Sequence, residues 1–159
     1  MQNELTFRFA TRQDVPLILS FIKALARYEK MEDQVVADEA LLTHWLFDDP
    51  KAEVIFVVAG GQEVGFALFF HNFSTFLGKA GLYLEDLFVL PEHRGRGYGK
   101  ALIKKLASIA VERGCGRLDW SCLDWNTPSI DFYLSLGATP LSDWTGYRVA
   151  GDALRTLAE

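Results

Sequence analysis

The chain has 159 residues, of which half are hydrophobic and 13% are aromatic. This length and composition fit a single domain spanning residues 1–159 and exclude an intrinsically disordered chain. The formal charge of −5 and the isoelectric point of about 5.2 argue against nucleic acid or an anionic membrane surface as a partner. No apolar run has the roughly 18 residues of a membrane helix, and the N-terminus lacks a signal-peptide pattern, so a soluble, cytoplasmic protein is expected.

The N-terminal third predicts one strand followed by two helices. Alternating hydrophobicity marks Leu5–Phe9 as the strand. Residues 11–29 repeat apolar side chains at three- and four-residue steps, which predicts a helix with one buried face and with Pro16 in its first turn. A shorter helix is predicted over residues 38–47. Its inward side chains are expected to be Leu41, Leu42, Trp45 and Leu46.

The middle third changes from helical to strand periodicity. Residues 54–59, 63–73 and 82–90 are three runs rich in β-branched and aromatic residues. The pair Gly60-Gly61 is a turn signal between the first two runs. We therefore expect three consecutive antiparallel strands.

The last third predicts alternating helices and strands. Helices are expected over residues 97–112, 127–136 and 152–158, and strands over residues 117–123 and 144–149. The order of strands and helices is then β-α-α-β-β-β-α-β-α-β, with a short helix at the end. This order predicts an α/β (α+β) fold, in which helices cover both faces of one mixed, mostly antiparallel sheet.

The most informative segment is a glycine-rich turn, Arg94-Gly95-Arg96-Gly97-Tyr98-Gly99, between a predicted strand and a predicted helix. Its spacing fits neither a P-loop nor a dinucleotide-binding fingerprint. Glycines let a backbone approach a ligand closely, and the N–H groups of a helix N-terminus favour an anion. Arg94 and Arg96 add positive charge. The turn predicts a pyrophosphate site, with an ordinary glycine-rich surface turn as the alternative.

Four ordered segments resemble one branch of the GNAT N-acetyltransferase superfamily, the spermidine/spermine and thialysine N-acetyltransferases. The glycine-rich turn fits the superfamily signature Arg/Gln-x-x-Gly-x-Gly/Ala. The branch motifs are matched by residues 26–30 (ARYEK), 82–89 (LYLEDLFV) and 124–133 (DWNTPSIDFY), the last followed by Gly137-Ala138. The resemblance covers nearly the whole chain. It implies the GNAT acyl-CoA N-acyltransferase fold, acetyl-CoA as co-substrate, and a small-molecule primary amine as acceptor: a thialysine- or lysine-like amino acid, a diamine or a polyamine.

The resemblance also implies cofactor contacts outside the glycine-rich turn. They are expected at Leu87, Phe88, Val89, Asn126, Ser129 and Tyr133. Main-chain N–H groups near Phe88 and Val89 are expected to stabilise the oxyanion of the reaction. The family often has basic residues near the CoA 3′-phosphate just after the matched tyrosine, where this chain has Leu134 and Ser135. Lys100 or Lys104 is the alternative contact for that phosphate.

Acetyl transfer to an amine needs a base, because only the neutral amine attacks and an alkyl ammonium has a pKa near ~10.4. The resemblance assigns this role to Glu85, acting through a water molecule. Strand alternation places Glu85 and Asp86 on opposite faces, and a β-bulge would bring Asp86 to the cleft instead. Asp86 is therefore the second candidate. Tyr133 matches the general acid that protonates the leaving CoA thiolate.

The predicted acceptor site consists of Tyr28, Glu29, Ser74 and Thr75, together with Glu85 and Asp86. Tyr28 and Glu29 match the substrate-side pair of the branch, and Glu29 is expected to hold a distal ammonium. The pair Ser74-Thr75 resembles the thialysine-type loop and favours an amino-acid-like or short diamine substrate over a long polyamine. A polar hairpin turn is the alternative explanation of these two residues.

No metal is predicted, because His44, His71 and His93 lack metal-site spacing and Cys115 and Cys122 lack zinc-type spacing. The resemblance implies a homodimer. Two other functions stay open because a fold does not determine a substrate. One is a protein or peptide acetyltransferase on the same fold, and the other is a non-catalytic acyl-CoA-binding sensor.

Overall fold

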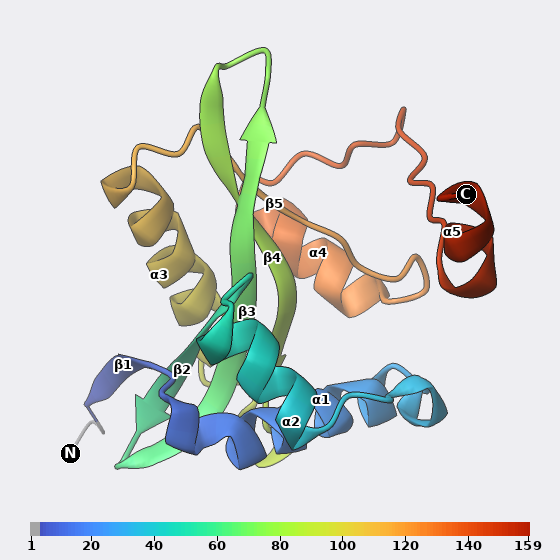
Figure 1. Ribbon diagram of the computed structural model, residues 1–159. Coiled ribbons are helices and arrows are strands. Elements are labelled where there is room, and N and C mark those ends of the chain that lie inside the picture. Colours follow the sequence, from blue (N-terminus) through green and yellow to red (C-terminus); the bar gives the residue numbers. More distant parts are fainter. Residues whose placement is uncertain (1–3) are drawn as a thin grey trace. The chain divides into compact units, whose positions relative to one another are not determined.

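The computed structural model describes residues 4–159, which form two compact units that divide after Ser121. The first unit contains a five-stranded sheet with the strand order β1-β2-β3-β4-β5 (Figure 1). Its strands are β1 (Leu5–Phe9), β2 (Glu53–Ala59), β3 (Gln62–Ser74), β4 (Lys79–Val89) and β5 (Leu118–Trp120). The first four strands pair antiparallel and β5 runs parallel to β4. The predicted mixed sheet is confirmed, and its fifth strand is shorter than expected.

The helices of the first unit follow the predicted order. They are α1 (Val15–Tyr28), α2 (Glu39–Thr43) and α3 (Tyr98–Glu112), accompanied by short 3-10 segments η1 (Arg12–Asp14), η2 (Glu32–Gln34) and η4 (Pro91–His93). Pro16 lies in the first turn of α1, as predicted. Gly114 follows the end of α3 with φ 74°, the left-handed conformation that glycine adopts at a helix C-terminus.

The two faces of the sheet carry separate apolar cores. Ile55 and Val57 of β2 belong to the core beneath α3, together with Leu102 and Leu106 of that helix. Phe56, next to both on β2, belongs to the core beneath α1. Because neighbouring strand residues point to opposite faces, α1 and α3 lie on opposite sides of the sheet (Figure 1). The predicted arrangement of helices on both faces is confirmed.

The second predicted helix changes its form halfway. It begins at Glu39 and is capped by Asp38, whose side chain accepts a hydrogen bond from the Leu41 N–H. It then continues as a π-helix, η3 (His44–Asp48). Leu46 is buried and Leu42 is partly buried, but Leu41 and Trp45 are nearly half exposed. The prediction of four inward residues is therefore wrong for Leu41 and Trp45. The wider π turn, which contains Trp45, moves that side chain off the face expected for an α-helix.

The second unit, Cys122–Glu159, contains the helices α4 (Thr127–Ser135) and α5 (Gly151–Leu157). The strand predicted over residues 144–149 is not formed. A strand exists only as part of a hydrogen-bonded ladder, and the described residues of this unit include no strand to pair with it. Across residues 4–159, no helix has the length and apolar character needed to cross a membrane.

Candidate functional site

A β-bulge interrupts β4 at Glu85. Leu84 pairs with Phe69 and Asp86 pairs with Leu68, so Glu85 has no partner on β3. Leu84 and Leu87 consequently pack on the same α3-side core although they are three residues apart, whereas Phe88 packs on the α1-side core. Asp86, two residues before Phe88, shares the α1 side. The strict alternation expected from the sequence is wrong here, and the bulge is the condition under which Asp86 was the second candidate.

The same part of β4 has one edge that β5 does not cover. The parallel ladder between the two strands joins Leu82–Leu84 only to Leu118–Trp120 and ends there. From Glu85 to Val89, β4 remains paired with β3 on its other edge, apart from the bulge. Backbone groups that point away from β3 over this stretch therefore lie outside both ladders, in the segment where oxyanion-stabilising N–H groups were expected.

Among the carboxyl groups of the site, Asp86 has the largest shift in pKa. Its side chain is partly buried, and this burial is the main reason why the pKa of Asp86 is raised to about 6. The negative charge of Glu85 raises this pKa further, and that of Glu29 makes a smaller contribution. Glu29 is itself partly buried, which raises its pKa above the ordinary value. Glu85 is exposed. We call Glu29, Glu85 and Asp86 the acidic cluster.

The end of α1 brings the predicted acceptor residues to β4. Tyr28 is the last residue of α1 and Glu29 caps the helix. The Tyr28 ring centre lies 6.3 Å from that of Phe88, while Glu29 acts electrostatically on Asp86. The structure thus brings together four residues that the sequence predicted for the site: Tyr28, Glu29, Asp86 and Phe88.

The glycine-rich turn connects η4 to the N-terminus of α3. Gly95 and Gly97 have φ values of 79° and 82°, in the left-handed region that disfavours side chains. A Cβ added at either glycine meets no atom within 4 Å, so both face open space. Gly97 is the N-cap of α3, and the first N–H groups of a helix have no acceptors within it. An open backbone cradle at the start of a 15-residue helix fits a diphosphate.

The hairpin residues are explained by the turn itself. The buried Ser74 accepts a hydrogen bond on its Oγ from the Leu77 N–H at 3.2 Å, and its carbonyl accepts one from the Gly78 N–H at 2.8 Å. Thr75 is exposed. The structure therefore favours the hairpin-turn interpretation of Ser74, and a role of Ser74 or Thr75 toward the acceptor rests on the resemblance alone.

Three predicted residues belong to the second unit. The buried Asn126 caps α4, where its side-chain oxygen accepts a hydrogen bond from the Ser129 N–H at 3.4 Å. Tyr133 lies in α4, partly buried, with its ring centre 5.6 Å from that of Phe132. Asn126 and Ser129 thus have a local structural role in starting this helix.

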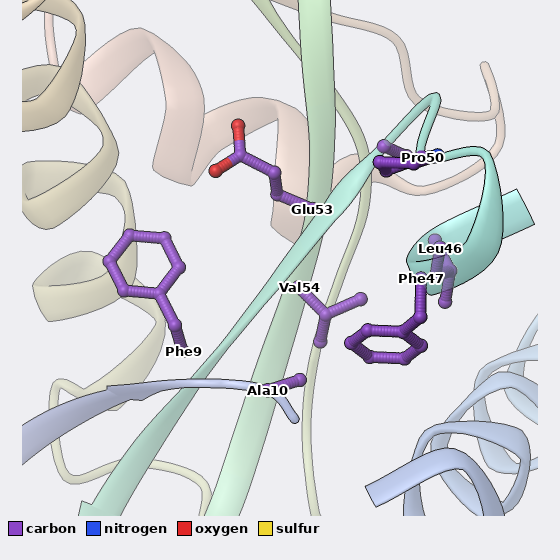
Figure 2. Close-up of a pocket in the computed structure, with 8 residues that line it drawn as sticks. Phe9, Ala10, Leu46, Phe47, Pro50, Glu53 and Val54 are labelled. Carbon is purple, nitrogen blue, oxygen red and sulfur yellow. The ribbon is translucent and has the colours of Figure 1, made fainter. Parts of the chain in front are cut away.

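A separate pocket of about 330 Å³ lies at the end of β1 and the start of β2 (Figure 2). It is lined by Phe9, Ala10, Leu46, Phe47, Pro50, Ala52, Glu53 and Val54. The carboxylate of Glu53 is bound by both terminal nitrogens of Arg113, at 2.6 and 2.9 Å. None of the predicted site residues lines this pocket, and no sequence motif marks it. Residues 4–159 contain no group of three or more His, Cys, Asp or Glu side chains placed to hold a metal ion.

Comparisons with known proteins identify the family of the chain. The sequence model of the acetyltransferase (GNAT) family matches residues 19–138. The thialysine N-epsilon-acetyltransferase of Sus scrofa is 38% identical over 95% of both chains. The L-ornithine N5-acetyltransferase of Arabidopsis thaliana is 31% identical, over 94% of this chain and 86% of its own. An integron cassette protein from the mobile metagenome of V. cholerae has a similar structure, with a TM-score of 0.82, 29% identity and 98% coverage of both chains.

GNAT acetyltransferases use acetyl-CoA to acetylate amines, and the glycine-rich turn of this chain lies within the range that the family model matches. From the match over residues 19–138 and the thialysine acetyltransferase relatives, the chain belongs to the GNAT family of acetyltransferases.

Proposed function

We propose that the protein transfers the acetyl group of acetyl-CoA to a primary amine of a small cationic molecule. The observation that carries the proposal is the acidic cluster, in which Glu85 and Asp86 at the bulge of β4 come shortly before the glycine-rich turn. The turn supplies a site for the diphosphate of the cofactor, and the cluster supplies negative charge and a base for the amine. Main-chain N–H groups near Phe88 and Val89 support the oxyanion that forms on the thioester carbonyl.

The base is assigned to the pair Glu85 and Asp86, in which Asp86 accepts the proton. A general base works best when its pKa lies near the working pH, and burial brings the pKa of Asp86 to about 6. Glu85, which the resemblance assigns as base, is exposed and acts here by raising the basicity of its neighbour. The two carboxylates interact, so their titration belongs to the pair.

The acceptor is a molecule with a second positive charge. Glu85 and Glu29 both act electrostatically on Asp86, and a second ammonium compensates the negative charge that remains when Asp86 takes the proton of the reacting amine. Glu29, at the end of α1, is assigned to this distal ammonium. The relatives named for thialysine and L-ornithine support amino acids with a side-chain amine, and short diamines carry the same pair of charges.

Tyr133 is assigned as the general acid that protonates the leaving thiolate. We expect Tyr133→Phe to lower kcat by about 10²-fold while the Kd of acetyl-CoA changes less than about threefold, because only a proton donor is lost. Stopped-flow turnover and calorimetric titration measure the two quantities. A large loss of affinity with normal turnover would make Tyr133 a cofactor or packing contact instead.

The function is tested by thiol release from acetyl-CoA with a panel of amines: thialysine, L-lysine, L-ornithine, 1,4-diaminobutane and spermidine. We expect acetylated product, identified by mass spectrometry, with a higher kcat/KM for the first four than for spermidine. Absence of product with every amine, despite tight binding of acetyl-CoA, contradicts the proposal and favours a sensor. The homodimer implied by the resemblance stays a prediction.

A further inference from the structure

Arg94 links the acceptor side of the proposed site, at the end of α1, to its cofactor side, at the glycine-rich turn. Its guanidinium carbon lies 4.9 Å from the centre of the Tyr28 ring and 4.9 Å from that of the Phe88 ring. Its Nε donates a hydrogen bond to the backbone carbonyl of Val89 at 3.0 Å. Arg94 is also the first residue of the glycine-rich turn. One side chain therefore contacts the end of α1 and the end of β4 while its backbone begins the turn.

These contacts require an arginine. A planar guanidinium stacks on aromatic rings while its Nε keeps a fixed direction, whereas a lysine ammonium is a point charge on a flexible stem. Arg96, two residues later, is exposed between two glycines with positive φ. The sequence presents the two arginines as equivalent charges beside a phosphate site. The structure distinguishes them, because Arg94 uses its side chain to contact the protein.

We propose that Arg94 is a positioning residue that couples coenzyme A binding at the glycine-rich turn to the acceptor-side end of α1. The inference rests on the proposed function, because it takes the turn as the cofactor site. Phe88 is buried and held by the core, whereas Tyr28 is 38% exposed at a helix end. When the cofactor immobilises the turn, Arg94 also immobilises Tyr28 and its neighbour Glu29. Coupling between two sites is reciprocal, so a change at Tyr28 alters coenzyme A affinity.

A double-mutant cycle on the Kd of coenzyme A, measured by calorimetry, tests the coupling without an acceptor and without turnover. Tyr28→Leu removes the ring, Tyr28→Phe keeps it, and Arg94→Lys keeps the charge but loses the planar group. We expect Tyr28→Phe to lose less coenzyme A affinity than Tyr28→Leu. Tyr28→Leu and Arg94→Lys should each weaken binding by about three- to tenfold. The double variant should be no weaker than Arg94→Lys alone, because both changes break one interaction.

Lys105→Met is the matched control. Lys105 Nζ lies 5.8 Å from the centre of the Phe7 ring, so this variant also removes a stacked cation, and we expect unchanged coenzyme A affinity. Thermal unfolding of each variant identifies any that is misfolded. In turnover, Arg94→Lys should raise the KM of the amine as well as that of acetyl-CoA, whereas an arginine that serves the cofactor alone leaves the amine KM unchanged.

The outcomes separate the inference from the function on which it rests. Additive losses in the double variant, or normal coenzyme A affinity in Tyr28→Leu, overturn the coupling while the acetyltransferase assignment stands. A wild-type protein that does not bind coenzyme A contradicts the assignment and the coupling together.

Discussion

Asp86→Asn is expected to lower kcat/KM for the amine by about 10²- to 10⁴-fold at pH 7.5, which is the range that a general base contributes. The wild-type profile should rise with pH through a pKa of about 6, because Asp86 must lose its proton before it can accept one from the ammonium. In Asp86→Asn this rise should disappear. Activity should recover partly at high pH, where more of the amine is already neutral.

Glu85→Gln is the matched comparison, because it also removes one carboxylate from the bulge. The negative charge of Glu85 raises the pKa of Asp86, so this variant should shift the rise to lower pH while retaining it. A profile of kcat/KM from pH 5 to 10 measures both effects. If the rise disappears in Glu85→Gln and persists in Asp86→Asn, then Glu85 is the base and the assignment to Asp86 is wrong.

Thermal unfolding shows whether Asp86→Asn loses activity because it lacks the base or because it folds poorly. Because folding raises the pKa of Asp86 to about 6, the folded protein binds the proton more tightly than the unfolded chain, and stability falls as pH rises toward 6. Replacing the carboxylate by an amide removes this cost. We therefore expect Asp86→Asn to unfold no earlier than the wild type at pH 7.5. A much lower Tm would show that the variant is inactive because it is poorly folded.

Gly97→Ala should weaken the binding of coenzyme A by at least about tenfold. Gly97 caps α3 with φ 82°, and a Cβ in that conformation costs about 1–2 kcal/mol. Since nothing lies within 4 Å of the added atom, the strain is in the backbone conformation itself, and only a rotation of the backbone relieves it. Rotation turns away the N–H groups that the diphosphate needs. Calorimetric titration with coenzyme A measures the loss.

Gly99→Ala is the comparison for the same turn. Gly99 lies inside α3, and an added Cβ meets Leu87 and Val89 only at the ordinary contact distances of 3.8 and 4.0 Å. Without backbone strain this variant should lose much less affinity than Gly97→Ala. Equal losses would mean that the added methyl group, and not the left-handed backbone, determines affinity at the turn.

Most of the fold was predictable because it follows local periodicity. The strands and helices that surround the two cores appear near their predicted positions, and α1 and α3 show the expected amphipathic faces. The strand predicted over residues 144–149 is not formed. Its composition suits a strand, but pairing depends on a neighbouring strand, which a local pattern does not report.

The sequence proposes residues for the candidate site but does not report the electrostatic interactions among them. The sequence placed the glycine-rich turn and the β4 carboxylates, yet the bulge depends on how β3 pairs with β4. The raised pKa of Asp86 also depends on Glu29, which is distant in sequence and is brought near by α1. For the same reason, the contact of Arg94 with Tyr28 has no signal in the sequence.

Coenzyme A is expected to bind with its diphosphate on the backbone of residues 94–99. A titration of the ¹⁵N-labelled protein with coenzyme A, followed by amide chemical shifts, tests it directly. We predict that the largest shifts occur at Gly95, Gly97 and the first turn of α3, with further shifts from Asp86 to Val89. Phosphopantetheine, which lacks the diphosphate, should shift the glycine-rich turn much less. Largest shifts around the pocket lined by Phe9 and Phe47, with the turn unperturbed, would contradict the account.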